Sequence, residues 1–252
     1  KTISQLRFQT GAGVGECSQA LKEANGDIDR AIEVLRKKGS AKAAKKAERA
    51  TKEGIIAIKV ADDHQSGSLA AINCETDFVA KNSDFIAFVN NLIQGANPEE
   101  EFKAKKEELI LKIGENLTFG IAQTLKGAYV AGYLHANKKL AALVSFNKEV
   151  LPELAYDIAM HITASNPLYL QPADVPTAET DKEKEIYREQ LKAENKPEAI
   201  REKIIAGKLE KYYEEVCLLN QRFIKDDSLT IQQLLSKIGQ DIKIEKFVRH
   251  QI

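Results

Sequence analysis

The chain has 252 residues, and its 37 basic residues balance its 37 acidic ones, so it lacks the basic excess typical of nucleic-acid-binding proteins. Hydrophobic residues make up 43% and charged residues 29% of the chain, an ordinary composition for a soluble protein with one large or several small cores. Aromatic residues are only 6%, with no Trp, which argues against carbohydrate binding and against a base-stacking platform.

The three cysteines, Cys17, Cys74 and Cys217, lie far apart in the sequence and form no CxxC pair. This spacing predicts neither a structural zinc site nor a disulfide framework, and a reducing cytoplasm fits it best. The sequence shows no signal peptide and no apolar run of about 18 residues, so we expect neither a transmembrane helix nor a membrane partner.

Residues 1–39 predict a compact unit of three short helices. A glycine-containing break at residues 10–13 ends the first helix, and Asn-Gly ends a second helix that covers residues 14–24. Asp27 is placed to cap a third helix, and Gly39 is placed to end it. A unit of this size has a small core and suits docking rather than chemistry.

A strongly basic segment follows this unit. Residues 36–52 hold eight basic residues against one acid, Glu48, which gives a net charge of +7. The apolar residues of this segment are alanines, so we interpret residues 40–53 as a basic linker that is partly helical. A contact with RNA or the ribosome is the alternative interpretation of the charge.

The pattern changes at Gly54, where β-rich segments begin. Two of them, joined by a turn at residues 62–67, predict a hairpin, and two helices and a third strand follow. A similar hairpin starts at residue 128 and is again followed by a helix, which predicts a duplicated subdomain. The expected strands cover residues 54–60, 68–75, 116–127, 128–136 and 140–146, and the expected helices cover residues 81–93 and 98–113.

The second copy carries an insertion of charged, helical sequence at about residues 179–215. Pro197 is placed to start a second helix there, so the insertion predicts an antiparallel coiled-coil hairpin. The rest of the chain predicts a strand, a helix and a last strand, over residues 216–223, 230–239 and 242–250. The sequence therefore predicts an α+β fold.

Few residues of the chain suggest catalytic chemistry. The glycine-rich stretch at residues 11–15 follows no predicted strand and lacks the frame of a phosphate loop, so it predicts a turn between helices. The four histidines are dispersed, and packing or surface roles are expected for them. The sequence contains no GxSxG or HExxH motif and no D-x-D-x-D loop, which likewise argues against an enzyme.

The stretch from Cys74 to Val79 is the strongest candidate for a site. Its Cys, Glu, Thr and Asp are adjacent, so they cannot converge on one metal ion, and Thr76 or Asp77 is expected to cap a helix that begins near Val79. A metal-dependent enzyme that uses Cys74, Asp77 and a histidine stays an alternative, as does a scaffold without chemistry. Phe78 either tucks inward against the helix or projects outward as an anchor, and the residues alone do not decide between these.

Four segments of the chain carry a resemblance to a known family. They are LRFQTGAGVGECSQALKEANGDIDRAIEVLRKKG at residues 6–39, INCETDFVAKNSDF at 72–85, KIGEN at 112–116 and DIAMHITASNPLYL at 157–170. In this order they resemble the elongation factor Ts family, whose members exchange the nucleotide of the translation GTPase elongation factor Tu. The resemblance extends over essentially the whole chain.

The resemblance implies an architecture and an activity. It implies a ubiquitin-associated-like module, a basic linker and two α+β core subdomains, the second with the coiled-coil hairpin, over residues 1–39, 40–53, 54–127 and 128–252. It implies a cytoplasmic guanine nucleotide exchange factor, not an enzyme, that has elongation factor Tu as its partner and no cofactor, metal or directly bound nucleotide. A homodimer and a 2:2 complex with the GTPase both stay open.

The resemblance also implies contact residues. In the family, the Asp-Phe of the TDFV motif projects into the GTPase, where the Phe wedges beside the nucleotide and disturbs the Mg²⁺ site. Matched position by position, the expected contact residues are Thr76, Asp77, Phe78 and Val79 in the motif, Ile113, Gly114 and His135 in the core, and Val14 and Gly15 in the N-terminal module.

Overall fold

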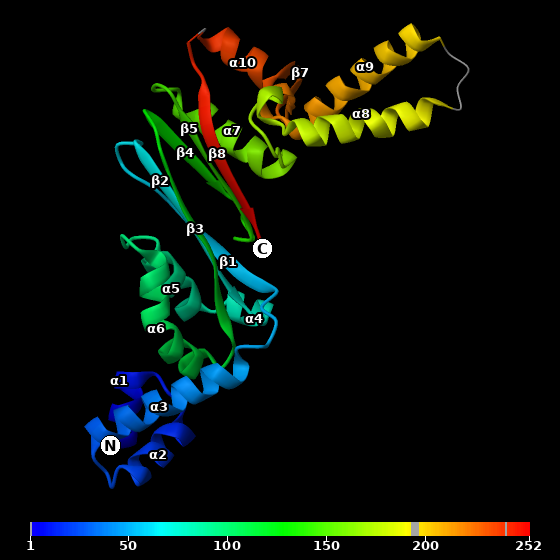
Figure 1. The fold of residues 1–252 in the computed structure, drawn as a ribbon. Coiled ribbons are helices and arrows are strands. Elements are labelled where there is room, and N and C mark those ends of the chain that lie inside the picture. Colours follow the sequence, from blue (N-terminus) through cyan, green and yellow to red (C-terminus); the bar gives the residue numbers. More distant parts are fainter. Residues whose placement is uncertain (1, 193–196, 240) are drawn as a thin grey trace.

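Helices and small antiparallel sheets share the chain, as the α+β prediction requires (Figure 1). The computed structural model describes residues 2–192, 197–239 and 241–252. The molecule is elongated, with the N-terminal helices at one end, two sheets in the middle and a pair of long helices that projects from the other end. Among the described residues, no helix is both long enough and apolar enough to span a membrane.

Three helices pack together in the N-terminal part of the chain. They are α1 (Thr2–Thr10), α2 (Val14–Glu23) and α3 (Ile28–Lys46). Leu6, Cys17 and Leu35, one from each helix, are buried in their shared core. The Asp27 carboxylate accepts a hydrogen bond from Arg30 N at 3.0 Å, so the predicted cap of the third helix is confirmed.

The third helix does not end at Gly39, as the sequence predicts, but continues to Lys46. Its extension packs on α6 (Pro98–Ile113), and a Cβ atom at Gly39 would lie 3.4 Å from the Glu107 carbonyl oxygen. Gly39 thus lies in the contact between two helices instead of ending one. Ser40 also donates a hydrogen bond to the Glu107 carboxylate, so the first half of the expected linker is a helix fixed to the core.

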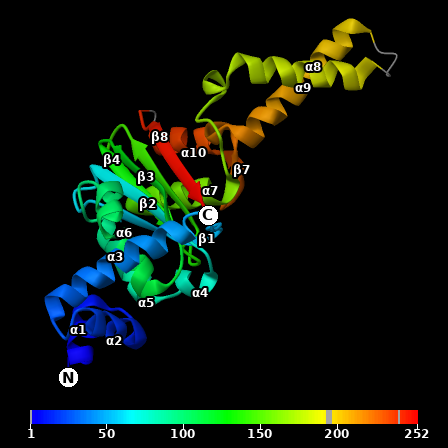
Figure 2. The ribbon, with the colours of Figure 1, turned by 60° about the horizontal axis from the view of Figure 1, so that its bottom comes forward.

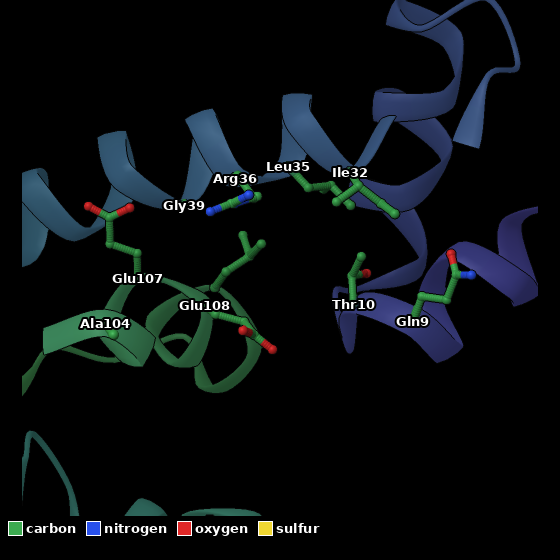
Figure 3. A pocket seen from close by; sticks show the side chains of 10 residues that line it. Gln9, Thr10, Ile32, Leu35, Arg36, Gly39, Ala104, Glu107 and Glu108 are labelled. Carbon is green, nitrogen blue, oxygen red and sulfur yellow. The ribbon is translucent and has the colours of Figure 1, made fainter. Parts of the chain in front are cut away.

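A crevice lies beside this contact, between α1, α3 and α6 (Figure 3). Leu35 and Arg36 line it from α3, and Glu107 and Glu108 line it from α6. Because its walls come from both the N-terminal helices and α6, its shape depends on how α3 rests on α6.

The first sheet has three antiparallel strands in the order β1-β2-β3, and helices between the second and third strands pack on one of its faces. The bounds are β1 (Glu53–Val60), β2 (Ser66–Cys74), α4 (Asp77–Ala80), α5 (Ser83–Leu92) and β3 (Leu117–Lys126). The single helix predicted over residues 81–93 is not continuous with the turn before it. The Asn82 side chain accepts hydrogen bonds from Asp84 N and Phe85 N, which starts α5 anew.

The second sheet has the same connectivity, with a hairpin, a helical excursion and a third strand that pairs with the second. Its strands are β4 (Tyr129–Leu134), β5 (Leu140–Phe146) and β8 (Ile244–Gln251), and its covering helices include α7 (Pro152–Ser165) and α10 (Ile231–Ile238). The predicted last strand and last helix are thus confirmed. Thr230 Oγ1 caps α10 by accepting a hydrogen bond from Gln233 N at 3.2 Å.

The two sheets pack face to face, and the helices cover their outer faces. Successive strand residues point to opposite faces. Ile56 and Leu69 of the first sheet therefore meet Val130 and Leu143 of the second in one buried cluster, whereas Ile55 packs with the helices. The molecule has four layers in this region: helices, sheet, sheet and helices.

A pair of antiparallel helices, α8 (Thr177–Lys192) and α9 (Glu198–Val216), projects from the second sheet (Figure 2). Leu191 and Ile205 are buried in this pair, and Arg188 pairs with Glu202 across it at 3.4 Å. Residues 193–195 of the predicted first helix lie outside the described part of the chain.

The predicted strand over residues 216–223 is wrong for most of its length. The elements there are the end of α9, a 3₁₀ turn (Leu218–Asn220) and the short strand β6 (Arg222–Phe223), which pairs with β7 (Asp226–Thr230). The segment lies against the chain after α7, near a 3₁₀ turn at Pro172–Asp174, and Leu218 N donates to Tyr169 O at 2.9 Å. Hydrogen bonds to this distant segment, with a single parallel bridge between Tyr169 and Cys217, take the place of a strand ladder.

Candidate functional site

A one-turn helix forms the tip that follows β2. The Thr76 hydroxyl accepts a hydrogen bond from Val79 N at 3.4 Å and so caps α4. The prediction that Thr76 or Asp77 caps a helix is confirmed for Thr76, but the helix begins at Asp77 rather than near Val79. A helix of four residues has too few hydrogen bonds to persist alone, so its position depends on contacts with the core.

Phe78 projects from this tip into solvent. Its side chain is 82% exposed, whereas the next two residues, Val79 and Ala80, are 9% and 6% exposed and pack in the core of the first sheet. Phe78 thus points outward, and the buried Val79 and Ala80 attach the tip to the core. Burying such a ring against a partner would remove a large apolar area from water.

Asp77 is paired within the tip rather than with the neighbouring Cys. Its carboxylate accepts a hydrogen bond from Lys81 Nζ at 2.7 Å, and this bond lowers the pKa of Asp77 below its ordinary value. Cys74 is fully buried and its thiol donates to Thr76 O at 3.2 Å. Burial, with Glu115 and Glu53 nearby, raises the pKa of Cys74 to about 12, so it is a neutral packed thiol.

Metal-ligating side chains do not gather at the tip. Within residues 2–192, 197–239 and 241–252, no group of three or more His, Cys, Asp or Glu side chains is arranged to hold a metal ion. Two of the four histidines have packing roles: the His64 ring stacks on Tyr129 at 4.6 Å, and the buried His161 bonds to Gln221 at 3.1 Å. Burial lowers the pKa of His161, which keeps this ring neutral.

The carboxylate of Glu115 holds the base of the tip. It accepts hydrogen bonds from Glu75 N and Thr76 N, both at 3.0 Å, and from the Thr76 hydroxyl at 2.6 Å. Sequence reasoning missed this residue, although it belongs to the KIGEN segment. Its partners, Glu75 and Thr76, lie about 40 residues earlier in the chain, so no local pattern marks its role.

Ile113 and Gly114, which the resemblance selects from the same segment, lie at the end of α6. Ile113 is half-buried against the core of the first sheet, and Gly114 is exposed. Gly114 ends the helix with a left-handed backbone, φ 88°, and its carbonyl accepts a hydrogen bond from Lys46 Nζ. These two residues lead directly into Glu115.

His135 lies in the turn that joins β4 and β5, and the structure brings this turn close to the tip. The ring is exposed, and its Nδ1 lies 3.2 Å from the Tyr133 hydroxyl. Residues 136–139 of the turn and Asp77 and Lys81 of the tip line a common surface groove. The first and second sheets therefore both contribute to the surface around Phe78.

Val14 and Gly15 lie elsewhere, at the start of α2 in the N-terminal helices. Val14 is 54% exposed and Gly15 has open space around it. Val14 lines a shallow groove with Ile3 and Phe8, and Phe8 is 92% exposed. We call these three residues the N-terminal patch; sequence reasoning missed Phe8 and Ile3.

Part of the basic segment is paired within the protein. Lys38 pairs with Glu23 at 2.6 Å, Arg49 pairs with Glu75 at 3.6 Å, and Lys46 bonds to a core carbonyl as described above. Internal partners thus account for part of the charge that suggested an RNA contact.

The fold presents two exposed apolar surfaces on different parts of the molecule. An exposed aromatic ring stands on a buried, hydrogen-bonded base, a groove from a second sheet lies beside it, and an apolar patch lies on separate helices. The polar side chains at the base are engaged with backbone groups of the protein itself.

Comparison with known proteins identifies the family. The model of the Elongation factor TS family matches residues 75–252. The protein named Elongation factor Ts from Clostridium perfringens (strain SM101 / Type A) is 42% identical, over 99% of this chain and 91% of that protein. Those of Halothermothrix orenii (strain H 168) and Clostridium kluyveri (strain ATCC 8527) are 41% and 40% identical, over 100% and 98% of this chain and 91% and 90% of those proteins. This chain belongs to the elongation factor Ts family.

Proposed function

We propose that the chain is a guanine nucleotide exchange factor for elongation factor Tu. It binds the GTPase in its GDP state, disturbs the Mg²⁺ and phosphate site, and promotes GDP release so that GTP can bind. The observation that carries this proposal is the outward Phe78 on its buried base, in a chain of the elongation factor Ts family. The chain itself makes and breaks no covalent bond, binds no nucleotide directly and works in the cytoplasm.

The proposed contact surface consists of one inserted side chain and the residues that position it or add contacts. Phe78 is the wedge, and Asp77, held toward Lys81, sets the position of the partner helix that the wedge displaces. Thr76 and Val79 fix the tip from below. Ile113, Gly114 and His135 add contacts from the core. Val14 of the N-terminal patch and its neighbour Gly15 add a second contact.

The proposed domains follow the same plan. Residues 1–39 form a ubiquitin-associated-like module, residues 40–53 a basic connection, and residues 54–127 and 128–252 two related α+β subdomains. Helices α8 and α9 form a coiled-coil hairpin at about residues 179–215. A monomer acting alone, a homodimer and a 2:2 complex with the GTPase are distinguished by the mass of the complex in solution.

Burial of Phe78 alone supplies too little free energy for a large loss of GDP affinity. Binding of the factor and binding of GDP oppose each other by the same free energy, because the coupling between two ligands is reciprocal. Burying one Phe contributes about 1.5–3 kcal/mol. That is roughly a tenfold to hundredfold change in an equilibrium. A larger loss of GDP affinity therefore needs the core contacts, the N-terminal patch and the lost Mg²⁺ coordination as well.

The direct test is the release of a fluorescent GDP analogue from elongation factor Tu after a chase with excess GDP. We expect the chain to accelerate release in a saturable way, at catalytic amounts. A release rate that does not change with added chain would overturn the proposal. A heat-denatured sample of the chain is the matched control for unspecific effects.

A further inference from the structure

Two glutamates, Glu75 after β2 and Glu115 after α6, accept hydrogen bonds from each other's neighbouring backbone at the base of the tip. Glu115 accepts three hydrogen bonds from the Glu75–Thr76 segment, at 2.6–3.0 Å. In return, Glu75 accepts a hydrogen bond from Asn116 N at 2.6 Å. Each carboxylate thus bonds to the main chain beside the other, and the end of β2 is tied to the end of α6. We call this pair the carboxylate brace.

The brace also contacts the segment that follows α3. Glu75 pairs with Arg49 at 3.6 Å, and its side chain is only 19% exposed. The Asn116 side-chain amide donates to Arg49 O at 2.8 Å and to Ala47 O at 3.4 Å. The chain just after α3, the end of α6 and the end of β2 are therefore joined at one point.

The setting of the two carboxylates requires these hydrogen bonds. Glu75 and Glu115 are both partly withdrawn from water, which is unfavourable for a carboxylate unless hydrogen bonds offset it. Their hydrogen bonds converge on the two residues before Asp77 and Phe78. Because α4 is a single turn, the direction of Phe78 depends on this brace and on the burial of Val79 and Ala80.

We propose that Glu115, through the carboxylate brace, is a positioning residue that holds Phe78 in its outward direction before the GTPase is met. This inference rests on the proposed exchange function. A tip that is already ordered loses less conformational freedom on binding. Without the brace, only a fraction of the chains present Phe78 correctly, and the apparent affinity falls by that fraction.

A double-mutant cycle tests the proposal. Glu115→Gln keeps the shape and removes the charge of the acceptor, and we expect it to raise the concentration of chain that gives half-maximal GDP release about tenfold. In a Phe78→Ala background, the same change is expected to have little effect, because there is no ring left to position. Glu108→Gln, at an exposed glutamate of α6 seven residues before Glu115, is the matched control and is expected to leave release unchanged.

Amide hydrogen exchange of the free chain supplies a second, independent measurement. Glu115→Gln is expected to speed exchange over residues 75–80 and to leave β1 protected. The proposal is overturned if the loss of GDP release is the same in both backgrounds, if release is unchanged, or if exchange at the tip is unchanged. If the wild-type chain does not accelerate release at all, the exchange function fails, and amide exchange still decides whether the brace orders the tip.

Discussion

Two exposed phenylalanines, Phe78 and Phe8, differ in what lies beneath them. Phe78 is 82% exposed and Phe8 is 92% exposed, so exposure alone would rank Phe8 first. Under Phe78, two successive buried residues and the carboxylate brace fix a single helical turn to the core. Phe8 stands on α1, whose buried residue is Leu6 and whose Thr10 hydroxyl bonds back to Leu6 O within the helix.

We expect this difference to separate the proposed wedge, Phe78, from a docking surface. A wedge must keep its direction while it displaces groups of the partner, which requires a base that does not yield. A docking patch, the role that we propose for Ile3, Phe8 and Val14, contributes apolar area and tolerates adjustment. We therefore expect substitutions at the two phenylalanines to affect different steps of the exchange reaction.

The largest expected effect is that of Phe78→Ala. We expect GDP release from elongation factor Tu to be accelerated roughly ten to a hundred times less than by the wild-type chain. The ring is exposed, so the thermal unfolding curve is expected to stay the same. The matched variant Phe8→Ala is expected to weaken binding and to leave the maximal release rate nearly intact. Equal losses of the maximal release rate in both variants would show that Phe78 and Phe8 do not act in different steps.

The base under Phe78 can be loosened at Gly114, which has a left-handed backbone with φ 88°. Gly114→Ala is expected to lower the free energy of unfolding by about 1 kcal/mol, because a Cβ atom disfavours this conformation. Gly114→Asn is the control, since Asn tolerates the left-handed region better. Urea unfolding followed by circular dichroism measures both, and an unchanged midpoint for Gly114→Ala would contradict the strain that we infer.

The helix beside the N-terminal patch can be stabilised at Gly15, the second residue of α2, where nothing lies within 4 Å of a Cβ atom. Gly15→Ala is expected to raise stability by about 0.5–1 kcal/mol, because Ala is the better helix former. Thermal unfolding of the full chain measures this. A loss of stability would show that the space beside Gly15 is not free. A change in the maximal rate of GDP release would show that Gly15 affects the same step as Phe78.

The smallest expected effect concerns the thiol beneath the tip. The unfolded Cys74 thiol has an ordinary pKa of 9.0, and the folded one has a pKa of about 12. Its stabilisation is therefore complete below pH 9 and is lost as the pH rises toward 12. Cys74→Ala is expected to flatten this alkaline decline in urea unfolding.

Iodoacetamide is expected to label Cys74 more slowly than Cys17, which lies in the smaller N-terminal core. Faster labelling of Cys74 would argue against a fixed base under the tip.

Sequence reasoning predicted what is local and missed what depends on distant partners. The hairpins from Gly54 and from residue 128, and the caps at Asp27 and Thr76, follow from short patterns that act on their own neighbours. The local pattern predicts a helix end at Gly39, whereas α3 continues because it packs on α6, which lies far along the chain. Glu115 was missed for the same reason, since its acceptor role toward Thr76 appears only once β2 and α6 meet.

The direction of Phe78 shows the same limit. Local patterns permit both an inward and an outward ring, and the resemblance to the elongation factor Ts family selects the outward one. In the structure, burial of Val79 and Ala80 leaves Phe78 on the solvent side of the turn. The apolar segment at residues 216–223 is a further case, because its burial comes from contact with the chain after α7 and not from a strand ladder.

The claim that Phe78 enters the GTPase beside its nucleotide is tested most directly by photo-cross-linking. With a photoreactive benzoyl-phenylalanine in place of Phe78, we expect cross-links to elongation factor Tu that map next to its nucleotide and Mg²⁺ site. The same group in place of Phe8 is expected to map to a different surface. Cross-links from position 78 that lie away from the nucleotide site, in complexes that still accelerate GDP release, would contradict the account.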